Sequence, residues 1–277
     1  MHIFQVFRLR VQRSANYTLF EDQQASAAQI IERCIHSKPS LDQRNAVWRI
    51  GNTKTISDVL VFFFGKTTKT QKPTYDEDTG NFTDVEDESS PHSFVLFDQT
   101  NQTLAISKNN ELAPTEKAIA NKLVNVLKSS DFAQKQEVEF IIDELNDPEP
   151  FLDSLKSAYA VEKFVLKFIK PNPRDVDEYF HAPFEKLVEA TDAKEGRAEV
   201  KGASLKTDVL EDLTHSAASS GDDIYALVRL KQGDRKTTRK NLKGNPVHLS
   251  SENPSEEKYL LRLIESMRQL YGKIRNG

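Results

Sequence analysis

The segment Ala46–Phe64, AVWRIGNTKTISDVLVFFF, decides the class of fold because it holds apolar runs on either side of turn residues. The first run is Ala46–Gly51, which contains Trp48, and the second is Asp58–Phe64. Gly51 and Asn52 between them favour a turn. The segment therefore predicts a β-hairpin, and with it an antiparallel sheet.

Neighbouring segments extend this sheet. Phe94–Phe97 and Leu104–Ser107 predict another hairpin around a polar loop. Ile3–Gln12 alternates between a buried face and a solvated face, with Phe7, Leu9 and Val11 on the first and Arg8, Arg10 and Gln12 on the second.

Helical spacing of apolar residues marks Ser26–Ile35 and Pro114–Leu127. We predict an N-terminal α+β domain, residues 1–130, with a mostly antiparallel sheet and flanking helices. Within it, residues 66–91 carry lysines followed by acidic residues and few apolar ones. They lack the spacing of a calcium-binding loop, so they predict a long polar loop.

Strands and helices alternate after a polar segment at 131–136. The strands are expected at 138–142, 161–169, 197–200 and 224–230, and the helices at 150–158, 183–190 and 207–217. This order predicts a C-terminal α/β-like domain, residues 131–277, with a mixed sheet and packed helices. Residues 255–274 predict a long amphipathic terminal helix, with an apolar stripe formed by Leu260, Leu261, Ile264, Met267, Leu270, Tyr271 and Ile274.

The composition is that of a globular protein, with 38% hydrophobic and 29% charged residues in 277. The longest apolar run, Val59–Phe64, is far shorter than the roughly 20 residues of a membrane-spanning helix. The N-terminus lacks the pattern of a secretory signal. Cys34 is the only cysteine, which excludes an intrachain disulfide and fits a reducing cytoplasm. We therefore expect a cytoplasmic protein that does not contact membranes.

The strongest functional signal is a basic tract at residues 231–243, in a chain with 38 Lys+Arg against 42 Asp+Glu. Only Asp234 opposes its basic residues, which are Lys231, Arg235, Lys236, Arg239, Lys240 and Lys243. Such a patch binds polyanions by releasing the counterions condensed on phosphates. Glycines and polar residues predict an exposed, flexible ribbon, and Arg8, Arg10 and Arg13 are candidates to extend its surface.

Catalytic and cofactor motifs are weak by comparison. The 10 glycines are scattered, so no phosphate-binding loop forms, and the 6 histidines lack metal-ligand spacing. Cys34 and His36 point apart on a helix, which favours a core thiol. We predict no cofactor and no metal. One alternative stays open, a metal-dependent nuclease in which Glu199 and Lys201 act with an acidic residue at position 189 or 192.

The hairpin Ser93–Ser107, the helix 114–127, the closing helix 256–275 and the total length resemble RexA-type phage-exclusion proteins. The run Phe168–Pro173, the strand after Gly221 and the basic tract are similar to uncharacterised bacterial proteins that accompany mobile elements and phage-defence loci. This resemblance implies a cytoplasmic, dimeric, DNA-associated defence protein.

The sequence as a whole predicts a non-enzymatic nucleic-acid-binding protein of anti-phage defence, with DNA favoured over RNA and a homodimer expected. A third hypothesis is a protein-interaction subunit of a defence complex, in which the acidic segment and the terminal helix dock on a partner.

Overall fold

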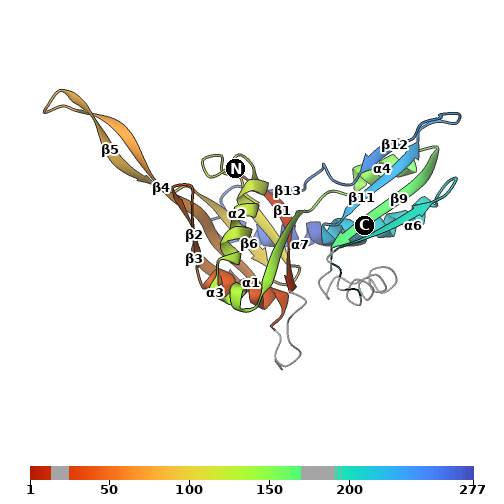
Figure 1. Cartoon of the computed structure of the whole chain (residues 1–277), viewed down its shortest axis with the longest axis horizontal. Helices are drawn as coiled ribbons and strands as arrows, with labels where there is room; N and C mark the ends of the chain where they lie inside the picture. The colour runs from red at the N-terminus through yellow and green to blue at the C-terminus, as the bar shows by residue number, and fades with distance from the viewer. Residues whose placement is uncertain (14–24, 170–190, 192, 194) are drawn as a thin grey trace.

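A computed structural model describes residues 1–13, 25–169, 191, 193 and 195–277. It contains two antiparallel sheets, one of nine strands and one of four, arranged along the long axis of the molecule (Figure 1). Helices pack on both sheets, so the predicted α+β class is confirmed. The predicted helix at 183–190 and the segment Lys170–Pro173 lie outside the described residues.

The first sheet runs in the order β13-β1-β7-β6-β4-β3-β2, with β5 paired to β4 and β8 paired to β1. Its strands are β1 (His2–Arg13), β2 (Ser40–Gln43), β3 (Ala46–Ile56), β4 (Val59–Asp76), β5 (Asn81–Ser89), β6 (His92–Asp98), β7 (Thr103–Ser107), β8 (Val138–Glu144) and β13 (His248–Ser251).

The β3–β4 hairpin is confirmed, but its turn lies at Ser57 and Asp58, both with positive φ, and not at Gly51 and Asn52. The register shifts between Gly51 and Lys54, so the glycine pair forms a bulge inside β3. Turn residues also serve bulges, where an extra residue is accommodated without ending the strand. The predicted hairpin is therefore present, but the predicted position of its turn is wrong.

Three helices cover one face of this sheet: α1 (Ala27–His36), α2 (Glu116–Lys128) and α3 (Asp131–Lys135). Ser26 caps α1 in a reciprocal arrangement with Gln29, and Thr115 caps α2. Cys34 of α1 is fully buried, which confirms its assignment to the core. Burial raises the pKa of its thiol above the ordinary value.

The second sheet has the order β10-β9-β11-β12, with strands β9 (Ala160–Ile169), β10 (Glu195–Lys201), β11 (Asp223–Arg229) and β12 (Thr238–Asn241). Every described pair in it is antiparallel, so the predicted mixed sheet is wrong. β10 and β11 do run in the same direction, as a strand–helix–strand unit requires, but β9 lies between them. The helices α4 (Glu149–Lys156) and α6 (Thr207–Ser220) pack on one face.

Strands from both sides of residue 130 share the first sheet. β1 pairs with β7 along one edge, and its other edge is shared by β13 near residues 2–5 and β8 along residues 7–13. The predicted boundary at 130 therefore does not coincide with the division between the sheets. β1 is long enough for two strands of the second half to align on it, which local sequence patterns cannot reveal.

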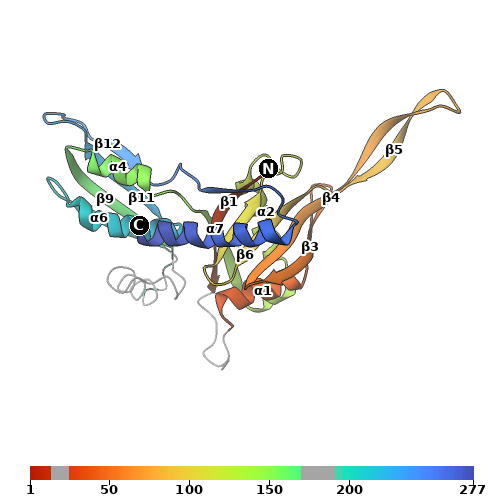
Figure 2. The ribbon, with the colours of Figure 1, turned by 180° about the vertical axis from the view of Figure 1, so that it is seen from behind.

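The terminal helix α7 (Glu257–Asn276) spans both sheets (Figure 2). Its buried side chains are Leu260, Leu263, Ile264, Met267, Tyr271 and Ile274, which confirms most of the predicted stripe, whereas Leu261 is 42% exposed. Arg268 donates through Nε and Nη2 to the two oxygens of buried Asp98, at 3.2 and 3.1 Å. His215 of α6 lies 2.9 Å from the Ile274 carbonyl through Nδ1. The stripe is thus covered within the chain, and homodimer formation stays a prediction.

The predicted solvated face of β1 is wrong for Arg8 and Arg10, which are 1% and 2% exposed. Arg10 donates to Asp143 of β8 at 2.6 Å and to Asp222, which precedes β11, at 3.3 Å. The Arg8 guanidinium lies 5.5 Å from the ring centroid of Tyr271. Asp222 of the α6–β11 junction and Tyr271 of α7 pack against these two arginines, which therefore join the halves of the molecule and form no basic surface.

The predicted polar loop at 66–91 is also wrong, because these residues continue β4 and form β5. Asp76 accepts from the amides of Asp78 and Thr79 at the turn, and Gly80 adopts φ +69. Beyond Thr68, β3 no longer pairs with β4, so the ribbon projects from the body (Figure 1). The threonines of this segment favour extended backbone, but its many charged residues suggested a loop in place of a strand. We call residues 69–89 the arm.

The substitution Asp222→Ala should lower the free energy of unfolding by about 3 kcal/mol, because it leaves the buried Arg10 guanidinium with one carboxylate in place of two. Chemical denaturation measures this change. The surface pair Lys156–Glu211 supplies the control, since Glu211→Ala should lower the free energy of unfolding far less. Equal losses in both variants would contradict a structural role for the cluster.

Candidate nucleic-acid interface

The second sheet has a covered face and a solvated face because side chains alternate along each strand. Phe164, Leu166, Ile224, Ala226 and Val228 are buried against α4 and α6. The intervening residues form what we call the open face: Lys163, Val165 and Lys167 of β9, Arg197, Glu199 and Lys201 of β10, Asp223, Tyr225 and Leu227 of β11, and Arg239 and Asn241 of β12. Val165 is itself fully buried, whereas the charged side chains around it reach solvent.

Basic residues outnumber acidic ones on the open face. The pairing register aligns Lys201, Lys163, Leu227 and Arg239 in one row across the strands, and Arg197, Lys167 and Asp223 in another. Neighbouring strands are about 4.8 Å apart, and alternate residues on a strand about 6.7 Å. The cations are therefore spread over a surface and are not confined to a single edge.

An aromatic ring lies at the centre of this surface. The Arg239 guanidinium is 3.8 Å from the ring centroid of Tyr225, a cation–π contact. Arg197 of β10 approaches the same ring from across β9. Its guanidinium lies 5.9 Å from the ring centroid and donates to the Tyr225 hydroxyl at 2.9 Å. Arg239 also donates to Asn241 at 2.8 Å. These contacts fix both guanidinium groups in place and orient their remaining donors.

Glu199, the candidate nuclease acid, is surrounded by cations. Its carboxylate lies 2.6 Å from Arg197, 2.8 Å from Lys201 and 3.0 Å from Lys163. Hydrogen bonds from Lys201 and Lys163 lower the pKa of Glu199 to about 2. Its partners at 189 and 192 lie outside the described residues. In the part of the chain that the structure describes, no three His, Cys, Asp or Glu side chains gather to hold a metal ion.

The basic tract is divided among several locations. Arg239 lies on the open face, whereas Lys240 pairs with Ala226 and points to the helical side of the edge strand. Lys231, Arg235 and Lys236 are exposed in the β11–β12 connection, where Asp234 accepts from the Lys231 amide. Lys243 follows β12 and acts electrostatically on Glu144. The predicted ribbon therefore includes an ordered edge strand.

Several residues of the open face were missed by sequence reasoning: Lys163, Lys167, Arg197 and Tyr225. Their signal was the alternation of charged and apolar residues in Lys163–Lys167 and Arg197–Lys201, which places the charges on one face of adjacent strands. A dense run of basic residues marks the tract alone, whereas charged residues at every second position mark the surface of the sheet.

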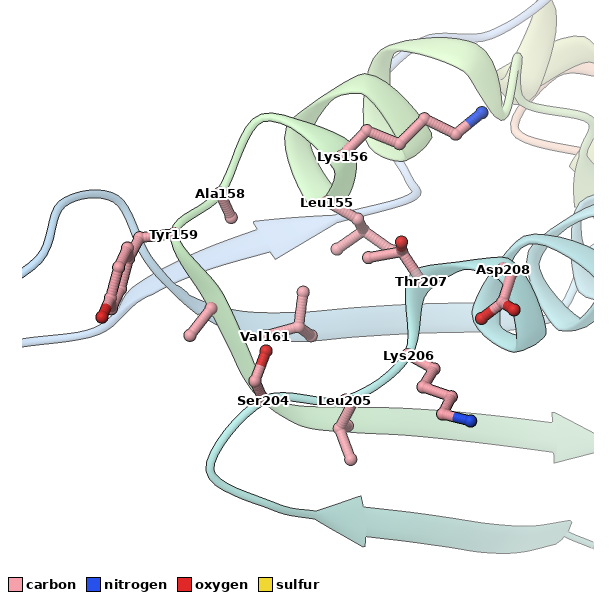
Figure 3. Close-up of a pocket in the computed structure, with 11 residues that line it drawn as sticks. Leu155, Lys156, Ala158, Tyr159, Val161, Ser204, Leu205, Lys206, Thr207 and Asp208 are labelled. Atoms are coloured by element: carbon pink, nitrogen blue, oxygen red, sulfur yellow. The ribbon is translucent and has the colours of Figure 1, made fainter.

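A separate cavity of about 500 Å³ lies where α4 ends and α6 begins (Figure 3). Leu155, Val161 and Leu205 line its interior, and Lys156 and Lys206 lie at its rim (Figure 3). Lys156 is 2.8 Å from Glu211, and the N-cap residue Lys206 provides no side-chain cap for α6. The exposed lining of the cavity is mostly polar and carries both signs of charge, because Asp208 lies beside the two lysines.

Comparison with models of known protein families and with curated proteins finds no match to this chain. Among the described residues, no helix is both long enough and apolar enough to cross a membrane. The functional interpretation therefore rests on the chemistry of the surfaces.

The carboxyl group of Glu199 should titrate near pH 2 in an NMR experiment, because its ion pairs are retained above the ordinary pKa of 4.5 and lost as the pH falls through about 2. Replacing Lys163 and Lys201 with alanine should move the midpoint toward 4.5. Lys156→Ala, on α4, is the control and should leave it unchanged. A midpoint near 4.5 in the parent protein would show that the cations do not hold Glu199.

Proposed function

We propose that this protein binds nucleic acid without cleaving it, through the open face of the second sheet and the adjoining β11–β12 connection. The observation that carries the proposal is the surface around Tyr225, where Arg197 and Arg239 are held against one aromatic ring and flanked by lysines. The proposed setting is anti-phage defence with DNA as the ligand, as the resemblance to phage-exclusion proteins suggests.

The charge balance favours a polyanion. Six basic side chains lie on or beside the open face, namely Lys163, Lys167, Arg197, Lys201, Arg229 and Arg239, against Glu162, Glu199 and Asp223. Arg229 pairs with Glu162, and Glu199 is shared among three cations. The connection adds Lys231, Arg235 and Lys236. In a chain with a formal net charge of −4, this surface concentrates positive charge that attracts phosphates.

Stacked guanidinium groups suit a nucleic-acid partner better than a simple anion. The contact with Tyr225 limits the motion of Arg239, so less side-chain entropy is lost when its donors bind phosphate. Arginine planes also stack on bases. A flat sheet with spaced cations can therefore contact several phosphates along one strand at once.

The nuclease alternative requires Glu199 to exchange its cations for a metal ion. Three basic groups within 3.0 Å already neutralise this carboxylate, which disfavours that exchange. The substitution Glu199→Gln separates the two functions. It should leave nucleic-acid binding intact or tighter, because it frees Lys163 and Lys201 for phosphate, whereas a nuclease would lose magnesium-dependent cleavage.

A triple variant of Lys167, Arg197 and Arg239 to alanine should weaken DNA binding and flatten its salt dependence. Each lost phosphate contact removes roughly 0.9 from the slope of log K against log salt concentration, so the slope should fall by about 2 to 3. Electrophoretic mobility shift or fluorescence anisotropy at several salt concentrations measures both quantities.

The matched control replaces three exposed lysines of the first sheet and its helices, Lys54, Lys128 and Lys135, with alanine. It carries the same change in net charge and should keep the parent slope. If both variants lose affinity equally, the binding follows net charge and not the open face. Unchanged affinity and slope in the open-face variant would refute the proposed function.

A further inference from the structure

Exposed apolar side chains collect at opposite ends of the molecule. Tyr75 and Phe82, at the tip of the arm, are 52% and 80% exposed, and their ring centroids are 5.1 Å apart. At the other end, Tyr159, Val209 and Leu230 are about half exposed, at 51%, 57% and 47%. Tyr159 lines the cavity of Figure 3, and Val209 is next in sequence to Asp208, which also lines it. Leu230 follows Arg229, which pairs with Ala160, the residue after Tyr159. We call this second surface the distal end.

The arm is unsupported by the body of the protein. Lys69–Asp76 would extend about 25 Å at the rise of a β-strand. Among the described residues, β4 pairs beyond Thr68 with β5 alone. A two-stranded ribbon is marginally stable in water, and exposed aromatic pairs mark contact surfaces. The tip therefore has the properties of a surface that is completed by a partner.

The ends have opposite charge. Residues 73–89 contain no Lys or Arg, and Asp76, Glu77 and Asp78 form the turn of the arm. At the distal end, Lys156, Lys206 and Asp208 lie at the cavity rim (Figure 3), and the neighbouring connection adds the exposed cations Lys231, Arg235 and Lys236. An aromatic tip with acidic neighbours thus complements the exposed apolar side chains of the distal end and the cations of its connection.

A single chain cannot make this contact with itself. The arm and the β11–β12 connection lie at opposite ends of the long axis in both views (Figures 1 and 2). Pairing between two arms would bring like charges together at the tip. Pro73 and the exposed charges of Asp84 and Glu88 further disfavour pairing along the edges of the arm.

We propose that the arm tip of one chain docks on the distal end of a second copy. Phe82 and Tyr75 contact the exposed side chains of Tyr159, Val209 and Leu230, and the acidic turn faces Lys206 and the cations of the β11–β12 connection. The contact is heterologous, because it joins different surfaces of identical chains, so it builds rings or open chains in place of a two-fold dimer. No arm residue belongs to the proposed nucleic-acid interface, whereas the distal end shares Lys231, Arg235 and Lys236 with it. The arm variant therefore tests self-association without changing the nucleic-acid interface.

Sedimentation velocity of the full chain and its variants tests the proposal. The parent should increase in mass with concentration, and less so at high salt. The arm variant Tyr75→Ser/Phe82→Ser and the distal variant Lys206→Glu/Val209→Glu should each weaken self-association at least about tenfold. A one-to-one mixture of the two variants should give a species of two chains, since each retains the surface that the other lacks.

The control Ile3→Ser/Leu261→Ser changes exposed apolar residues elsewhere and should associate like the parent. Melting temperatures near the parent value show that each variant is folded. A parent that stays monomeric up to about 1 mM overturns the proposal. Self-association that survives in the arm variant also overturns it. Self-association that survives in the distal variant overturns it as well and would indicate contact between arms. Failure of the mixture to form the two-chain species overturns it as well.

Discussion

The buried ion pairs of Arg10 hold together the elements on which the rest of the structure depends. Asp143 belongs to the first sheet and Asp222 introduces β11 of the second, so one guanidinium joins both. Burial opposes the charged form of Arg10, but the two carboxylates outweigh it and raise its pKa. Gly221 adopts φ +80, and a Cβ there would lie 2.7 Å from that of Asp143, so the chain approaches too closely for another residue.

This junction positions the candidate interface. β11 leaves Asp222 in a fixed direction, with β9 and β12 paired to its edges and α6 and α4 on its far side. Among the described elements, α4 and α6 cover only one side of the second sheet, and the open face is the other side. Arg268 and Asp98 fix α7 to the first sheet, and His215 contacts its last turn, so the helix limits movement between the halves. The cations around Tyr225 lie on a supported surface.

Sequence patterns predicted where helices and strands lie better than they predicted which elements pack against each other. Apolar spacing located α2, α7 and the β6–β7 hairpin, because these signals are local. The alternation of β1 predicts one buried and one solvated face, but Arg10 is paired with Asp143 and Asp222, and Arg8 lies against Tyr271. These partners are more than a hundred residues away in sequence. Charge density alone likewise found Arg239 and missed Lys163, Arg197 and Tyr225, which only the strand register brings together.

Crosslinking of the protein to a photoreactive DNA oligonucleotide, followed by identification of the modified peptides, tests the central claim most directly. The account predicts adducts on β9, β10, β11 and β12, centred on Tyr225, and their loss when unlabelled DNA is added in excess. Adducts confined to the first sheet or the arm, with the strands around Tyr225 unmodified, would contradict it.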